Sequence, residues 1–108
     1  MTASHITTIK RYFMNLEKSK KRITKKVKMG FQGYPTIAIE YFGQSPDHAT
    51  DVLVKFCFEE DADIQEERFS SKSDAREDEI IQSALVKMIE RSEAKTVTQS
   101  EGVSITTN

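Results

Sequence analysis

The chain has little cysteine and no long apolar run, and these absences exclude several classes of protein. Cys57 is the single cysteine among 108 residues, so an internal disulfide is excluded and a reducing, cytoplasmic location is predicted. No apolar run approaches the roughly 18 residues that a membrane-spanning helix requires, so we expect no membrane partner. The opening segment MTASHITTIK also lacks the apolar core and cleavage site of a secretory signal.

Motifs for catalysis and cofactor binding are also missing from the sequence. There is no nucleophile elbow, P-loop or dinucleotide-binding glycine pattern. Cys57 lies in a predicted strand among aromatic residues, which favours a buried apolar role over a reactive thiol. His5 and His48 lie far apart, and with one cysteine they do not form a zinc set. The acidic run 59–63 lacks the spacing of a calcium loop. We therefore predict a protein that is not an enzyme and holds no cofactor and no metal.

The composition that remains is polar but sufficient for a core. Apolar residues make up 37% of the chain and charged residues 31%, which suits a small soluble domain rather than a disordered chain. The length fits one domain. We predict a single domain over residues 1–95, followed by a flexible Ser/Thr-rich tail over 96–108. One extra edge strand is the alternative for that tail.

The charges are divided unevenly along the chain. Residues 1–30 carry nine basic residues and one acidic residue, a net charge of +8. Residues 31–108 carry seven basic and sixteen acidic residues, a net charge of −9. The basic segment suits phosphates or an acidic protein face. The alternative is that the two halves neutralise each other within one fold or a dimer.

Two segments have the periodicity of helices. Residues 6–17 place Ile9, Tyr12, Phe13 and Leu16 on one face. The basic residues 18–30 that follow are compatible with a helix, a strand or a mobile arm.

The second helix is predicted over residues 73–93. Its first turn is acidic, and Asp74 and Glu77 have the spacing of a capping box. Its predicted buried stripe consists of Ile81, Ala84, Leu85, Met88 and Ile89.

Three segments between the helices have the composition of strands. They are residues 36–42, 52–59 and 64–71. The second places Val52, Val54, Phe56 and Phe58 on one face. The third is charged, which is typical of a strand at the edge of a sheet. The predicted fold class is therefore α+β, with element order α-β-β-β-α. A small antiparallel sheet of three strands, or four if the tail adds one, carries both helices on one face.

Three fragments occur in an order and spacing typical of one family. They are Tyr34-Pro35-Thr36, Pro46-Asp47-His48-Ala49 and the segment SSKSDAR at 70–76. Together they resemble the double-stranded-RNA-binding domain, in particular the version attached to ribonuclease III, over roughly residues 17–91.

The resemblance implies an αβββα fold and a binding mode for duplex RNA. A side chain of the first helix and the loop histidine, here His48, would contact successive minor grooves of the duplex. Basic residues at the start of the last helix, here Lys72 and Arg76, would hold phosphates. The acidic run 77–79 departs from the family pattern, because negative charge repels phosphate.

These observations predict a small non-catalytic binding module and favour nucleic acid of the duplex-RNA kind. The candidate nucleic-acid-binding residues are Lys20, Lys21, Arg22, Lys25, Lys26, Lys28, His48, Lys72 and Arg76. The alternative is a protein-interaction, regulatory or inhibitor module, homodimeric in one version, that uses the acidic half or the edge strand 64–70.

Overall fold

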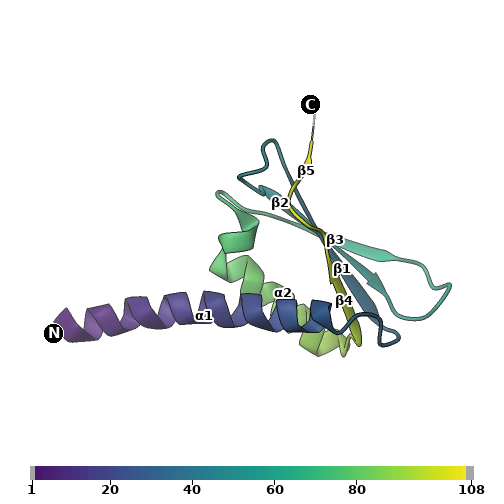
Figure 1. Cartoon of the computed structure of the whole chain (residues 1–108), viewed down its shortest axis with the longest axis horizontal. Coiled ribbons are helices and arrows are strands. Elements are labelled where there is room, and N and C mark those ends of the chain that lie inside the picture. The colour runs from purple at the N-terminus through teal and green to yellow at the C-terminus, as the bar shows by residue number, and fades with distance from the viewer. Residues whose placement is uncertain (1, 107–108) are drawn as a thin grey trace.

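The computed structural model describes the backbone of residues 2–106 and the side chains of residues 15–106 (Figure 1). The elements follow in the order α1 (Thr2–Lys28), β1 (Thr36–Gly43), β2 (Asp51–Cys57), β3 (Gln65–Ser70), the 3-10 helix η1 (Ala75–Glu77), α2 (Glu79–Ser92), β4 (Thr96–Gln99) and β5 (Ser104–Ile105). The predicted α+β class is confirmed. Within this part of the chain, no helix is both long and apolar enough to cross a membrane.

The sheet has five strands and is mixed rather than purely antiparallel. Its order is β3-β2-β1-β4, and β5 pairs with the end of β1. The three predicted strands form an antiparallel β3-β2-β1 meander. Strands β4 and β5 both run parallel to β1. The prediction of an antiparallel sheet is therefore corrected, because α2 carries the chain back so that β4 enters alongside β1 in the same direction.

The segment predicted as a flexible tail begins with a strand. Thr96 and Val97 are buried, with Val97 fully excluded from solvent beside Ile37 of β1. The Thr96 hydroxyl donates to the Gly33 carbonyl at 2.7 Å and accepts from the Gln32 amide at 2.8 Å. The alternative of an extra edge strand is thus the correct one, and the domain continues beyond residue 95.

Helix α1 continues through the basic segment whose conformation the sequence left open. Leu16, Ser19 and Ile23 are buried and Val27 is half-buried, and their spacing of three and four residues places them on one side of the helix. This side packs against α2 and β4. The predicted apolar positions 9, 12 and 13, and the histidine at position 5, lie outside the residues whose side chains are described.

The second predicted helix is divided into two pieces. Asp78 caps α2, because its carboxylate accepts from the backbone amides of Ile80 and Ile81 at 3.0 and 3.2 Å. Asp74 instead caps the short η1. The predicted capping-box start of α2 at Asp74 is therefore wrong by four residues, since the backbone is extended again at Asp78.

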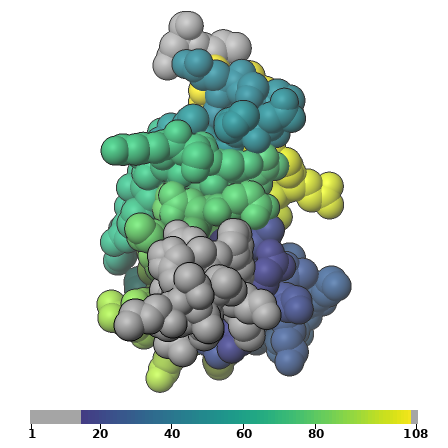
Figure 2. Space-filling view, turned by 90° about the vertical axis from the view of Figure 1, so that its left-hand side faces the viewer, coloured from purple at the N-terminus to yellow at the C-terminus, as the bar shows by residue number. Residues whose placement is uncertain are grey.

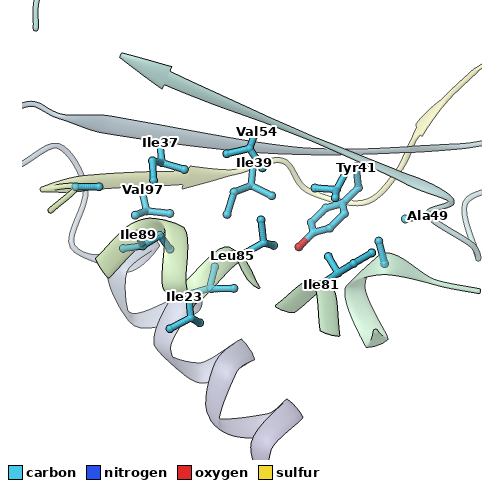
Figure 3. Close-up of a cluster of buried hydrophobic side chains, with 14 residues drawn as sticks. Ile23, Ile37, Ile39, Tyr41, Ala49, Val54, Ile81, Leu85, Ile89 and Val97 are labelled. Carbon is cyan, nitrogen blue, oxygen red and sulfur yellow. The ribbon is translucent and has the colours of Figure 1, made fainter. Parts of the chain in front are cut away.

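Both helices lie on the same face of the sheet, as predicted, and enclose one core (Figures 1 and 3). The most completely buried large side chains are Ile23, Ile37, Ile39, Val52, Val54, Leu85 and Val97. Of the predicted stripe on α2, Ile81, Leu85 and Ile89 are buried, while Ala84 and Met88 are half-buried.

The core face of β2 is shorter than predicted. Val52 and Val54 are fully buried, but Phe56 is half-buried and Phe58 is 43% exposed. The strand ends at Cys57, so Phe58 falls in the turn that follows and does not reach the helices.

The docking of α1 is tested by replacing Ile23, which is 1% exposed. We expect Ile23→Ala to lower the free energy of unfolding by about 2–5 kcal/mol, because it leaves a cavity between α1 and the core. The control is Thr24→Ala, because Thr24 is the exposed neighbour of Ile23 on α1. We expect it to change the free energy of unfolding by less than about 0.5 kcal/mol. Equal effects in urea unfolding would contradict this packing of α1.

Candidate nucleic-acid interface

The side of α1 opposite Ile23 carries a row of exposed lysines. Lys18, Lys21, Lys25 and Lys28 are all exposed, and their spacing of three and four residues places them on one helical face. We call these four residues the lysine stripe. It rises by about 15 Å along the helix axis. Lys18 was not among the predicted site residues, although the helical spacing identifies it once residues 18–30 are known to be helical.

Three other predicted basic residues of α1 are engaged within the molecule. Lys20 Nζ lies 2.6 Å from Glu77 Oε1, and Arg22 Nη1 lies 3.1 Å from Glu90 Oε1. Lys26 Nζ donates to the main-chain carbonyl of residue 94 at 3.3 Å. These contacts join α1 to η1 and α2, so the three residues flank the lysine stripe but also serve to position the helix.

Arg76 is held in a clamp with Asp74. The guanidinium donates from Nε to Asp74 Oδ1 at 2.9 Å and from Nη2 to Asp74 Oδ2 at 2.7 Å. Nη2 also lies within hydrogen-bond distance of the Pro46 and Asp47 carbonyls, at 3.4 and 3.3 Å. Asp74 accepts in turn from the Ala49 amide at 3.4 Å. The clamp therefore connects the β1–β2 loop to the start of the last helical region, which consists of η1 and α2.

The clamp is an ion pair at neutral pH. Hydrogen bonding from the Arg76 guanidinium, the largest effect, lowers the pKa of Asp74 below its ordinary value of 3.8. The same bond raises the pKa of Arg76. Because its Nε and Nη2 donors already bind protein oxygens, Arg76 is poorly placed for the phosphate contact that the family resemblance implies.

The other two predicted residues outside α1 lie near this clamp and are exposed. His48 is in the β1–β2 loop, and Lys72 precedes η1. Figure 2 shows this loop and the start of the last helical region on the same face of the molecule. Acidic Glu77 lies where this region meets α1, and Asp74 lies where it meets the β1–β2 loop. The structure therefore brings His48, Lys72 and Arg76 into one neighbourhood. Arg76 borders a cavity with Lys20 and Thr24 of α1, neither of which belongs to the lysine stripe.

The three acids that follow Arg76 have structural partners. Glu77 pairs with Lys20. Asp78 caps α2 and also accepts from the Ser71 hydroxyl at 2.9 Å, and Glu79 accepts from the Ser83 hydroxyl at 3.1 Å. Their charges nevertheless remain beside the helix start, so this end of the molecule attracts phosphate weakly.

A polar cavity of about 420 Å³ lies between α1, η1 and the segment that follows β4. At its edge the Tyr41 hydroxyl accepts from Gln82 Nε2 at 3.1 Å and donates to Gln99 Oε1 at 3.3 Å. Gln82 Nε2 also donates to the Ala75 carbonyl at 2.9 Å. Burial raises the pKa of Tyr41, so its hydroxyl stays protonated at neutral pH. This network holds β1 to α2, and no sequence pattern predicted it.

Comparison of the chain with protein-family models, curated proteins and solved structures gave no match. The resemblance of the three fragments to the double-stranded-RNA-binding domain therefore stays a prediction. Among the described residues, no group of three or more His, Cys, Asp or Glu side chains is placed to hold a metal ion. Within the described surface, the lysine stripe is the feature that indicates a class of ligand most specifically. That class is the polyanions.

The clamp predicts a pH-dependent contribution to stability. A carboxyl whose pKa is lower in the folded than in the unfolded chain stabilises the fold above its unfolded pKa. That contribution is lost as the pH falls through the folded value. We expect Asp74→Asn to lower the free energy of unfolding by about 1.5–3 kcal/mol at neutral pH, and the difference from the unmodified protein to shrink below pH 3.8.

Asp63→Asn is the matched control, because Asp63 is exposed in the β2–β3 turn. It should change stability by less than about 0.5 kcal/mol. Urea unfolding across the acidic range measures both variants. A difference for Asp74→Asn that is absent, or that is constant down to about pH 2.5, would contradict the clamp.

Proposed function

We propose that the protein is a non-catalytic nucleic-acid-binding module that holds the phosphate backbone on the lysine stripe of α1. The observation that carries the proposal is the exposure of four lysines on one helical face. Phosphate contacts made by such side chains supply most of the affinity of sequence-independent binding. Lys20 and Arg22 instead hold the helix in position against Glu77 and Glu90.

The dimensions of the stripe suit a nucleic-acid strand. Its rise of about 15 Å along α1 is comparable with the axial length of about four successive phosphates, at roughly 3.4 Å each in a duplex strand. Lysine side chains are long and flexible, so each can follow a phosphate without a rigid match in geometry. We therefore expect binding that depends on salt and little on sequence.

Duplex RNA is the form that we expect to bind most tightly. The family resemblance implies a helix, an antiparallel meander of three strands and a second helix, and α1, β1, β2, β3 and α2 follow this pattern. Strands β4 and β5, which run parallel to β1, lie outside it. The β1–β2 loop that carries His48 packs beside the start of the last helical region (Figure 2). The resemblance assigns RNA contacts to both segments. Since Arg76 is engaged by Asp74, we propose that the lysine stripe takes over the phosphate contacts of the helix start.

A titration with two charge-matched variants tests this proposal. The first replaces the lysine stripe with Gln at positions 18, 21, 25 and 28. The second replaces four exposed basic residues outside α1, namely Lys72, Lys87, Arg91 and Lys95, also with Gln. Both variants lose four positive charges, so only the location of the charge differs between them. Fluorescence anisotropy with a short RNA duplex, a DNA duplex and a single strand gives the affinities over a salt series.

We expect the unmodified protein to lose about 100-fold in affinity between 50 and 200 mM salt, as about four phosphate contacts imply. The stripe variant should bind at least about 10-fold more weakly at low salt, with a salt dependence near zero. The control should stay within about threefold of the unmodified protein. Equal losses in both variants would mean that net charge alone matters. Failure of the unmodified protein to bind any of the three nucleic acids at low salt would disprove the proposal.

A further inference from the structure

The turn between β2 and β3 is strongly acidic. Glu59, Glu60, Asp61 and Asp63 are all exposed there, and no basic residue lies among them. The turn is flanked by Phe58, which is 43% exposed, and Ile64, which is 59% exposed. We call residues 58–64 the acidic tip, and it projects from one end of the sheet in Figure 1. A projecting loop with negative charge and two apolar side chains has the composition of a contact surface.

Short-range hydrogen bonds close the acidic tip into a turn. The Ala62 amide donates to the Glu59 carbonyl at 3.1 Å, which closes a turn. Cys57 Sγ donates to the same carbonyl at 3.1 Å, and Asp61 takes a left-handed conformation with φ of 69°. The Phe56 and Phe58 rings stack at 6.3 Å. A preorganised loop loses little conformational entropy when it binds.

A groove of complementary character lies between α1 and α2. Val86, Ile89 and Met29 give it apolar walls, and three basic residues, Arg22, Lys25 and Lys26, lie around it with one acid, Glu90. Because Arg22 pairs with Glu90 at 3.1 Å, Lys25 and Lys26 give the groove its net positive charge. Its volume is about 240 Å³, and Met29 is 52% exposed. We call this the basic groove. An apolar cleft lined by positive charge fits an acidic segment that carries apolar side chains.

We infer that the acidic tip of one copy of the chain docks in the basic groove of a second copy. The acids of the tip match the positive charges of the groove, and Phe58 or Ile64 supplies the apolar side chain that fills it. If the two copies are related by a twofold axis, each tip occupies the partner's groove and the contact is made twice. This inference rests on the groove and the tip. Because Lys25 belongs to both the groove and the lysine stripe, the inference is tested without nucleic acid.

The small size of the tip sets the expected strength of the association. Stable interfaces bury about 1,200–2,000 Å² in total, which two seven-residue tips approach only in part. Charge pairs at the rim of an interface weaken with salt. We therefore expect a dimer that depends on concentration and dissociates at high salt.

Reversing the charges of the tip and of the groove by substitution tests the inference. One variant reverses the tip with Glu59→Lys, Glu60→Lys and Asp63→Lys, which leaves Asp61 as its one acid. Another variant reverses the groove with Arg22→Glu and Lys25→Glu. Each variant alone brings like charges together. A mixture of the two brings opposite charges together at both contacts of a twofold heterodimer. The variant Lys72→Glu with Lys95→Glu, at exposed positions outside both surfaces, has the charge change of the groove variant and serves as its control.

Sedimentation equilibrium of the full chain, without nucleic acid, measures the outcome. We expect the unmodified protein and the control to dimerise at low salt, each reversed variant to associate at least about 10-fold more weakly, and the mixture to regain association. Thermal unfolding of each variant confirms that it is folded. A monomeric unmodified protein, reversed variants that still dimerise, or a mixture that does not regain association would each overturn the inference.

Discussion

The burial of Ile23 is the interaction on which the other features of the molecule depend. This side chain is 1% exposed and belongs to the core that the sheet and α2 form. It fixes the rotation of α1 about its own axis, since neighbouring residues of a helix are turned by about 100°. With Ile23 inside, the lysine stripe faces solvent. Figure 3 shows Ile23 beside Leu85 and Ile89 of α2, so the same contact also joins the helices.

The formal net charge of −1 says little about binding, because the charges are sorted into separate surfaces. Ion pairs such as Lys20–Glu77 and Arg22–Glu90 join α1 to the last helical region. Exposed pairs of this kind contribute at most about 1 kcal/mol each to stability, so their main effect is to fix position. These ion pairs use residues outside the lysine stripe and the acidic tip. The stripe therefore keeps its positive charge and the tip its negative charge. The two proposed contacts, with phosphate and with a second copy, follow from these local surfaces.

The elements that have a local sequence pattern were predicted correctly. The predictions failed where contacts between distant parts of the chain determine the structure. Alternating apolar residues were enough to predict β1 and β2, and charge was enough to place β3 at an edge. Strand β4 was predicted only as the alternative to a flexible tail, because Val97 is its single large apolar residue. Ile23 and Val27 are four residues apart, which a helix explains, but the adjacent residues fitted a strand as well. The engagement of Arg76 was not predictable, because two of its partners are loop carbonyls. Within the candidate site, the basic residues of α1 were predicted, but which of them stay exposed depends on the rotation of the helix.

The most direct test of the account is to map the binding surface by NMR. The backbone amide signals of the labelled full-length protein are followed while a short RNA duplex is added. The account predicts that signals of the lysine stripe shift or broaden first, ahead of those of His48 and Lys72. Changes centred on His48 and Lys72, with the stripe unaffected, would contradict it, because the contact would then lie at the β1–β2 loop and the start of the last helical region.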